Sequence, residues 1–273
     1  MWAILGGILL LGLYGFVVEP HWVSLREIHL TISGLDAEFE GFSILHLSDL
    51  HGRVGVFSKQ SVQNALQSCD MIALTGDLYA PSLDRRRLAR IIDTWDRDKL
   101  YYVSGNHDYR QGKLDTSPWE PDATLLDNRA VCLTRHDSEL WIAGIPDLVK
   151  GSPKLDKVLR SVPTGPPAIL LSHRPDGWLL PGTERFQLVL SGHTHGGQVR
   201  IPGFGAVFRH NHVPDRFVSG LYKRPGHPIL ITSRGLGMSE LPVRFMARPE
   251  ILHIILHTTK ERRKETAGGV SVE

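Results

Sequence analysis

The chain has 273 residues, of which 41% are hydrophobic, and its formal net charge is +2. This length is enough for one large domain or two small ones. The small charge produces no field that would attract nucleic acid. The two cysteines exclude a disulfide-rich scaffold and a zinc-finger framework, and they leave the redox compartment open.

The segment from Trp2 to Val18 contains no charged residue and is rich in Leu, Ile, Val and Gly. Its length is at the short end of the roughly 17–25 residues that span a bilayer. A cleaved signal peptide is disfavoured because nothing basic precedes the run and no small-residue cleavage site follows it. A buried core helix is also an alternative, but one with no polar face. We therefore expect residues 1–18 to be a transmembrane anchor in the inner cell membrane. Arg26 on its C-terminal side favours a cytoplasmic catalytic domain.

Beyond this segment, apolar runs with strand character alternate with amphipathic runs of helical spacing. Strands are expected at 27–32, 42–47, 70–75, 100–104, 140–144, 168–172, 186–190, 216–222, 228–232 and 251–257, and helices at 58–68, 83–95 and 155–162. Such alternation is typical of α/β proteins, in which ligands bind beyond the carboxyl ends of the strands. No repeat or linker divides the chain, so we expect one domain over residues 27–258 and a disordered polar tail over residues 259–273.

Five of these strands are followed by polar clusters that contain metal-binding residue types. The clusters are Asp49-Leu50-His51, Gly76-Asp77, Gly105-Asn106-His107-Asp108, His173, and Gly192-His193-Thr194-His195. Neutral imidazole is the commonest metal ligand among side chains. Because side chains alternate along an extended chain, Asp49 and His51 are expected to point the same way and to hold one metal. Each cluster alone is also compatible with a solvated turn, and His46, inside a strand, is expected in the core.

Taken together and in this order, the five clusters resemble the calcineurin-like metallophosphoesterases, and the match covers Phe42 to His195. The resemblance implies an α/β fold, built as a four-layer α/β/β/α sandwich with two metals at the sheet edges. It is closer to the membrane-associated phosphodiesterases that include the UDP-2,3-diacylglucosamine diphosphatases. Three features support that branch: Gly-Gly-Gln-Val-Arg at 196–200, Ser-Arg-Gly-Leu-Gly at 233–237 with Arg-Pro-Glu at 248–250, and the apolar N-terminus ending in Glu-Pro.

The family pattern implies a role for each matching residue. Asp49, His51 and His195 would hold the first metal, Asn106, His173 and His193 the second, and Asp77 would bridge both. The mixed oxygen and nitrogen donors imply two divalent ions, with Mn expected and Fe, Zn or Mg as alternatives. A metal-bridging hydroxide would attack phosphorus, His107 would protonate or stabilise the leaving oxygen, and Asp108 would orient the His107 ring. Family members often have an Asp three residues after the bridging Asp, where this chain has Ala80. That Asp usually supports the metal ligands without binding metal, so the resemblance predicts no such contact here.

The expected function is therefore metal-dependent hydrolysis of a phosphodiester or diphosphate in a lipid-linked substrate, such as UDP-2,3-diacylglucosamine in lipid A synthesis. A general phosphodiesterase or phosphatase of the cell envelope and a non-catalytic metal-binding scaffold are the alternatives. Arg53, Arg200 and Arg234 are candidates for binding the phosphate, with structural salt bridges as the alternative role. Gly196 and Gly197 are expected to leave room for the phosphate. Basic residues do not alternate with aromatic ones, which argues against a nuclease.

Overall fold

The computed structural model describes residues 2–79, 85–115, 123–208, 217–239 and 241–259. Its α-helices are α1 (Trp2–Leu13), α2 (Gln60–Ser68), α3 (Arg85–Ile92) and α4 (Leu155–Ser161). The first sheet contains, in spatial order, β1 (Ser24–Thr31), β16 (Glu250–His257), β2 (Ser43–Leu47), β3 (Met71–Thr75), β4 (Leu100–Val103) and β7 (Thr124–Leu125). The second contains β14 (Gly220–Tyr222), β15 (Ile229–Thr232), β11 (Leu188–Ser191), β10 (Ala168–Ser172), β9 (Ser138–Ile145) and β8 (Arg129–Arg135). Two short ribbons, β5 (Tyr109–Arg110) with β6 (Lys113–Leu114) and β12 (Arg200–Ile201) with β13 (Gly205–Ala206), lie outside the sheets.

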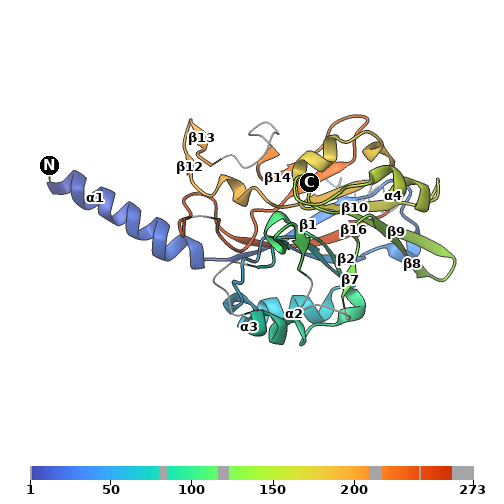
Figure 1. The fold of residues 1–273 in the computed structure, drawn as a ribbon, viewed down its shortest axis with the longest axis horizontal. Helices are drawn as coiled ribbons and strands as arrows, with labels where there is room; N and C mark the ends of the chain where they lie inside the picture. The colour runs from blue at the N-terminus through green and yellow to red at the C-terminus, as the bar shows by residue number, and fades with distance from the viewer. Residues whose placement is uncertain (1, 80–84, 116–122, 209–216, 240, 260–273) are drawn as a thin grey trace, which may run out of the picture.

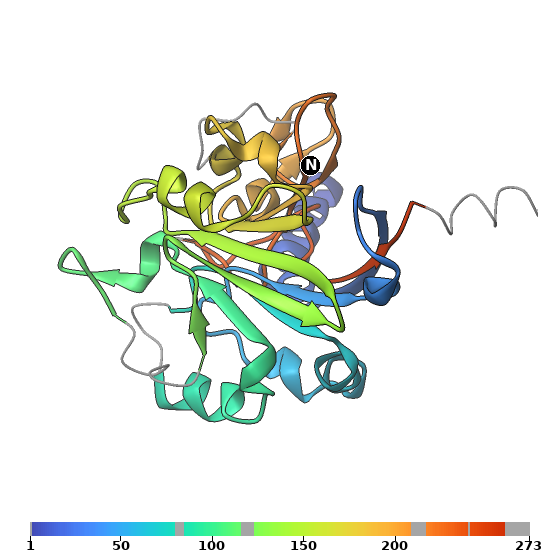
Figure 2. The same ribbon diagram turned by 90° about the vertical axis from the view of Figure 1, so that its right-hand side faces the viewer.

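Three hydrophobic clusters hold these elements in four layers (Figures 1 and 2). The inner strands are buried on both faces, as β2 shows: Leu45 and Leu47 face α2 and α3, whereas Ile44 faces the second sheet. The third cluster packs α4 and the turn around Trp178 on the other face of the second sheet. The predicted α/β/β/α sandwich is therefore present, and the predicted strand at 27–32 is part of β1 at the edge of the first sheet.

Parallel pairing brings the functional strand ends together. β2, β3 and β4 are parallel to one another in the first sheet, and β9, β10, β11 and β15 are parallel in the second. The carboxyl ends of each set therefore lie along one edge of the sheet. Backbone bonds join the loops at these ends, since Asp49 N donates to Gly76 O at 3.0 Å and Gly192 N to His173 O at 2.9 Å.

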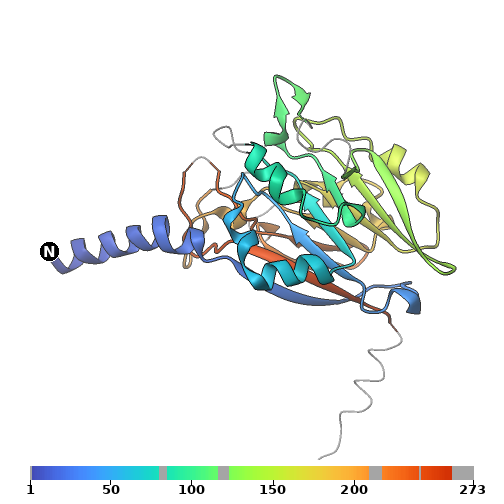
Figure 3. The ribbon, with the colours of Figure 1, turned by 90° about the horizontal axis from the view of Figure 1, so that it is seen from below.

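The N-terminal helix α1 projects away from the two sheets (Figures 1 and 3). Its described side chains are largely exposed, including Leu9 at 74% and Leu10 at 67%. Among the residues that the structure describes, no helix is long and apolar enough to cross a membrane. The predicted transmembrane anchor over residues 1–18 is therefore not supported. The physical reason is length, because the 12 residues of α1 rise about 18 Å against a hydrocarbon core of roughly 30 Å.

After α1 the chain packs on the domain. Residues Tyr14–Val18 form a π-helical turn, and Gly15 O accepts a bond from Arg244 N at 2.9 Å. The buried carboxylate of Glu19 accepts bonds from the backbone N–H groups of Met246 and Ala247 at 2.9 and 2.6 Å. Residues 14–19 are thus attached to the loop that follows β15. The predicted domain over residues 27–258 and the predicted disordered tail from residue 259 stay predictions. Ala80 and residues 260–273 lie outside the described residues.

His46 is a core residue, as the sequence predicted. Its side chain is fully buried in β2, and its Nε2 lies 2.9 Å from Thr75 Oγ1. Burial lowers the pKa of His46 to about 4. In the unfolded chain a histidine has a pKa near about 6.5, so below that pH the unfolded state binds a proton that the folded state excludes. His46 therefore lowers the stability as the pH falls from about 6.5 to about 4.

The His46→Leu variant tests this contribution. Between pH 7 and pH 5 the free energy of unfolding of the metal-free wild type should fall by about 2 kcal/mol more than that of the variant, because leucine does not titrate. Urea unfolding of both proteins at the two pH values measures the difference. Parallel losses of stability in the two proteins would contradict the assignment. Metal-free protein is needed so that acid release of metal does not contribute.

Candidate metal centre

The seven side chains predicted to bind metal all lie at the strand ends where the two sheets meet. Asp49 and His51 follow β2, Asp77 follows β3, and Asn106 begins the 3-10 turn Asn106–Asp108 after β4. His173 follows β10, and His193 and His195 follow β11. The structure therefore brings together residues that are up to 146 positions apart, from Asp49 to His195. Their role as ligands stays a prediction.

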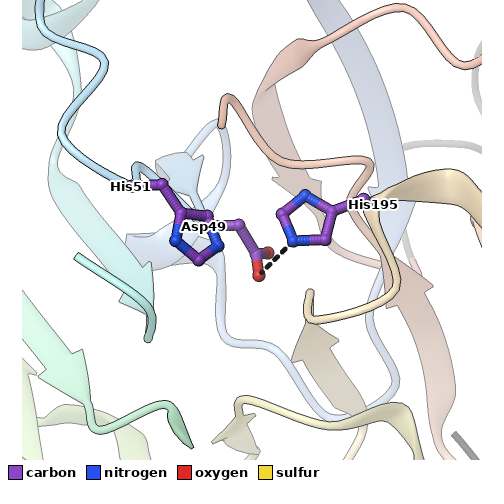
Figure 4. Close-up of side chains that lie close together, drawn as sticks. All are labelled: Asp49, His51 and His195. Carbon is purple, nitrogen blue, oxygen red and sulfur yellow. Dashed lines mark ion pairs between the residues drawn. The ribbon is translucent and has the colours of Figure 1, made fainter. Parts of the chain in front are cut away.

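Asp49, His51 and His195 form the first group (Figure 4). His195 Nε2 lies 3.7 Å from Asp49 Oδ1, and the His51 and His195 rings are stacked with centroids 5.1 Å apart. At most 5% of each side chain is exposed. One carboxylate and two imidazoles thus converge in a dry space at the end of β2 and β11.

Asp77, His173 and His193 form the second group. His173 Nε2 lies 3.4 Å from Asp77 Oδ2 and 3.1 Å from His193 Nδ1. Asn106 Oδ1 is 3.2 Å from His173 Nε2, so the amide oxygen lies beside this group as the sequence predicted. The Gly-His-x-His turn after β11 therefore supplies one histidine to each group.

Asp77 lies between the two groups. Its Oδ2 atom is 3.7 Å from His51 Nε2 of the first group and 3.4 Å from His173 Nε2 of the second. Its other oxygen, Oδ1, accepts a bond from His107 N at 2.8 Å. A single carboxylate oxygen thus faces both groups, which is the geometry that a bridging ligand needs.

Hydrogen bonds on the outer side of each group fix the direction of the side chains. Asp49 Oδ2 accepts from Ser48 Oγ at 2.6 Å and from His193 N at 2.9 Å, which leaves Asp49 Oδ1 facing inward. His51 Nδ1 donates to Tyr79 O at 3.1 Å, and His173 Nδ1 donates to Thr75 O at 2.7 Å. A backbone carbonyl on Nδ1 fixes the tautomer and leaves the lone pair on Nε2, which is how metal-binding histidines are oriented.

The backbone at this site is in an unusual conformation. Five of the candidate ligands have φ between 39° and 69°, a region that side chains other than glycine rarely adopt: Asp49, His51, Asp77, His193 and His195. Such residues cluster at functional sites, where the surrounding structure holds them in place. The turns also need glycine, because a Cβ on Gly192 would lie 1.8 Å from Ser48 Oγ and 2.3 Å from Asp49 Oδ2.

The charges of the site are balanced around Asp77. Burial by itself would raise the pKa of Asp77, but the neighbouring His173 holds it well below the usual range. Burial would lower the pKa of His173, yet the Asp77 carboxylate raises it to about 10. A proton on His173 therefore supplies the positive charge that the buried carboxylate requires. Divalent cations would supply the same charge.

The site fits two divalent metal ions by its donors and by its unpaired atoms. Asp49 Oδ1 and His51 Nε2 are buried and have no hydrogen-bond partner among the described residues. Buried polar atoms are normally paired, so two such atoms aimed into one space point to an absent ligand. Each group offers one carboxylate and two imidazoles, a donor set that suits zinc and other first-row metals.

The structure corrects the predicted role of Asp108. Its carboxylate does not orient the His107 ring but accepts backbone N–H groups of Gly105, Asp77 and Leu78 at 2.8, 2.9 and 2.9 Å. Asp108 therefore fixes the loop that carries Asp77. His107 is exposed, and its ring centroid lies 4.9 Å from that of His51, so it stands at the mouth of the site.

The three arginines proposed for phosphate binding are all engaged in bonds with the protein. Arg53 donates to Pro20 O, Arg200 Nη1 donates to Gly196 O at 3.2 Å, and Arg234 Nη2 pairs with the buried Glu250 carboxylate at 2.5 Å. These bonds fit the structural role that was the alternative at the sequence level. Phosphate binding by these side chains stays a prediction.

Close packing explains why positions 196 and 197 are glycine. A Cβ on Gly196 would lie 2.7 Å from Arg234 Cγ, and one on Gly197 would lie 2.3 Å from Ala206 Cβ. Both residues have positive φ, 65° and 76°. The two glycines thus permit close packing inside the protein, and clearance for phosphate stays a prediction.

Sequence reasoning missed Arg174 and its partner Asp147. Arg174 Nε donates to the buried Asp147 carboxylate at 2.6 Å, and Arg174 Nη2 lies 3.5 Å from Asn106 Oδ1. Asp147 follows β9, which is parallel to β10. A polar residue after an apolar strand is the pattern that could have identified Asp147 from the sequence. The ion pair with Asp147 thus holds the positively charged guanidinium of Arg174 beside the second group.

Arg244 was also missed. Its side chain is fully buried, and its guanidinium donates to backbone carbonyls that include His195 O at 3.2 Å and Ala247 O at 2.7 Å. Burial lowers the pKa of Arg244 to about 9. Its Nη2 atom also lies 3.4 Å from Nδ1 of the His195 ring. No strand pattern precedes Arg244, so no signal in the sequence identified it.

Comparisons with known proteins agree with this geometry. A family model described as calcineurin-like phosphoesterase matches residues 42–197. The chain is 29% identical to an uncharacterized metallophosphoesterase of Bacillus subtilis, YkuE, over 91% of each chain. It is 31% identical to the phosphodiesterase YaeI of Escherichia coli, with 87% of this chain and 90% of that protein covered.

Among solved structures, a 5'-nucleotidase precursor from Thermus thermophilus superposes with a TM-score of 0.50 at 13% identity. The match covers 81% of this chain and 55% of that protein, so this chain spans about half the length of the nucleotidase. At this identity the likeness concerns the fold alone. The family match and the two relatives extend over the strand ends that carry both groups of side chains. The chain therefore belongs to the calcineurin-like phosphoesterase family and is a phosphoester hydrolase.

Proposed function

We propose that the protein is a two-metal phosphohydrolase that cleaves a phosphodiester or diphosphate bond. The observation that carries the proposal is the Asp77 Oδ2 atom, which lies 3.7 Å from His51 Nε2 of the first group and 3.4 Å from His173 Nε2 of the second. Asp49, His51 and His195 hold one ion in this proposal, and Asn106, His173 and His193 the other. Manganese is the proposed metal, with iron, zinc or magnesium as alternatives.

Metal ions bound in this way lower the pKa of water and neutralise charge on the phosphoryl group. The remaining steps belong to the side chains. His107 donates a proton to the leaving oxygen, because it is exposed at the mouth of the site while its backbone N–H is fixed on Asp77 Oδ1. Arg174 is aimed toward Asn106 by Asp147 and is placed to bind a phosphoryl oxygen.

The proposed substrate is lipid-linked, for example UDP-2,3-diacylglucosamine in lipid A synthesis. The exposed apolar side chains of α1 support association with a membrane surface, since such a helix buries its side chains in lipid. We place the protein at the inner membrane with a cytoplasmic catalytic domain, the side on which hydrolysis of UDP-2,3-diacylglucosamine would require the active site. The relative named as a phosphodiesterase supports the class of bond. The alternative is a general phosphodiesterase or phosphatase of the cell envelope. A comparison of lipid-linked with soluble substrates distinguishes the two.

Removal of metal should abolish hydrolysis. Protein dialysed against a chelator should not hydrolyse bis-p-nitrophenyl phosphate, and reloading with Mn, Fe, Zn or Mg in turn should restore activity to different extents. Nitrophenolate release and metal content by mass spectrometry measure the outcome. Full activity with no metal detectable would contradict the proposal. No hydrolysis with any metal or substrate would favour a non-catalytic metal-binding scaffold.

Ligand variants should change the metal stoichiometry. The wild type should bind about two equivalents, and His195→Ala and His193→Ala should each reduce this to about one, because each removes a ligand from a different group. Asp77→Ala should weaken both sites, since its oxygen faces both groups. His227→Ala, outside the site, is the control and should retain both equivalents. Two retained equivalents in Asp77→Ala would argue against bridging.

His107→Ala should separate proton donation from metal binding. The variant should keep both metals but lose about 10²–10⁴-fold in kcat on a diester with an alkyl leaving group. The loss should be much smaller with p-nitrophenolate, which leaves without a proton. The exposed His136→Ala variant is the control. Equal losses on both substrates would assign His107 to substrate binding instead.

A further inference from the structure

A second cavity lies beside the metal centre, between the N-terminal segment and the loop that follows β2. Its volume is about 450 Å³. It is lined by Pro20, His21, Val23, Gly52, Arg53, Val54, Gly55, Val56, Lys59 and Leu236. We call it the N-terminal cavity. None of the side chains assigned to metal binding is part of its wall.

The wall of this cavity is formed partly by the loop that carries Asp49 and His51. Gly52 and Arg53 directly follow His51, so the Cα atoms of Arg53 and His51 are at most about 7.6 Å apart. Leu236, on the other side, donates its N–H to Ser48 O at 3.1 Å, and the next residue, Gly237, donates to Asp49 O at 2.6 Å. A ligand in the N-terminal cavity therefore lies next to the residues that position Asp49 and His51.

The chemistry of the wall combines apolar surface with positive charge. Val23, Val54, Val56 and Leu236 supply aliphatic side chains, and Arg53 and Lys59 supply two cations. Among the described residues, neither cation has an acidic partner, since Arg53 donates to the carbonyl of Pro20. An apolar cavity with two unpaired cations is complementary to an anion that carries a hydrocarbon chain.

The apolar surface of the N-terminal segment leads to this cavity. Phe16, Val17 and Val18 are 46–53% exposed, and they continue the exposed side chains of α1 up to Pro20 and His21 at the cavity wall. Exposed apolar side chains therefore extend from α1 to within two residues of Pro20 at the cavity wall.

The wall is held in place before any ligand binds. Glu19, next to Pro20, is buried and accepts the N–H groups of Met246 and Ala247. Arg248 stacks on Trp22 with its guanidinium 4.0 Å from the ring centroid, and Arg248 Nε donates to Trp22 O at 2.7 Å. A preformed wall reduces the entropy that binding would otherwise cost.

From this arrangement we infer that the N-terminal cavity is a subsite that binds a hydrocarbon chain of the substrate. The substrate class is an amphiphilic phosphoester, with its hydrocarbon chain among the valines and its anionic group near Arg53 and Lys59. This inference rests on the proposed phosphoester hydrolysis at the metal centre. It goes beyond that function by assigning to the N-terminal cavity the selection of an amphiphilic ester over a small soluble one.

A chain-length series tests the subsite. Methyl, butyl and octyl p-nitrophenyl phosphodiesters present the same bond with increasing hydrocarbon. In metal-loaded protein kcat/KM should rise about threefold to fourfold per methylene over the first few carbons, as expected for burial of each CH₂. The octyl-to-methyl ratio should reach at least about 50. A ratio near one, with metal-dependent hydrolysis of all three esters, would overturn the subsite and leave the proposed function standing.

Two variants link the effect to this cavity. Val23→Glu puts a carboxylate into the half-buried wall, and Val23→Trp fills the space without charge, so both should bring the octyl-to-methyl ratio near one. Leu179→Glu, at an exposed apolar position outside the cavity, is the matched control and should keep the wild-type ratio. Retained metal content shows that each variant is folded. A wild-type ratio in both Val23 variants would overturn the inference.

A binding measurement separates this inference from the proposed function. Octyl phosphate should bind metal-free protein at least about tenfold more tightly than inorganic phosphate in calorimetry, and Val23→Glu should remove the difference. If no ester is hydrolysed but this preference is present, the proposed function fails and the cavity remains. Equal affinity for the two phosphates would overturn the cavity assignment.

Discussion

The carboxylate of Asp77 is the group on which the rest of the site depends. It is 1% exposed, and a carboxylate removed from water to this extent needs positive charge and hydrogen-bond donors around it. His51 and His173 approach it from opposite sides, and the backbone of His107 donates to it. These partners come from three different strand ends. The need to satisfy one buried charge therefore sets where β2, β4 and β10 must end relative to β3.

The left-handed residues show how strongly the fold constrains this arrangement. Each non-glycine residue held at positive φ costs about 1–2 kcal/mol, and five of the candidate ligands are held there. The cost is met by the bonds between neighbouring loops, in which Asp49 N, His51 N and Gly52 N donate to the carbonyls of residues 76–78. The Asp108 carboxylate accepts two further bonds from this loop, from Asp77 N and Leu78 N, and one from Gly105 N. The two sheets, joined by the apolar cluster between them, keep these loops together.

The sequence predicted the parts that depend on local pattern. Apolar strands followed by polar clusters predicted the strand ends, which lie together because parallel strands place their carboxyl ends along one edge. The family resemblance then selected, within those clusters, the seven residues that the structure gathers. The four layers followed from the family resemblance. The role of Asp108 could not be predicted, since its backbone partners are brought together only by the turns after β3 and β4. The pair of Asp147 and Arg174 could have been found by the same rule, because Asp147 follows the apolar strand β9. Arg244 could not, because no strand directly precedes it.

The N-terminal run shows a different limit of the sequence. Its composition indicated a membrane segment, but composition does not reveal where a helix ends or what its last turn contacts. In the structure the chain from Gly15 to Pro20 is attached to residues 244–247 and to Arg53. Arg244 in turn donates to the carbonyl of His195, one of the candidate ligands. The apolar helix, the cavity beside it and the metal centre are thus joined by short bonds. Arg244 thus connects the turn that follows α1 to the loop of His195, because its backbone N–H binds Gly15 O and its guanidinium binds His195 O.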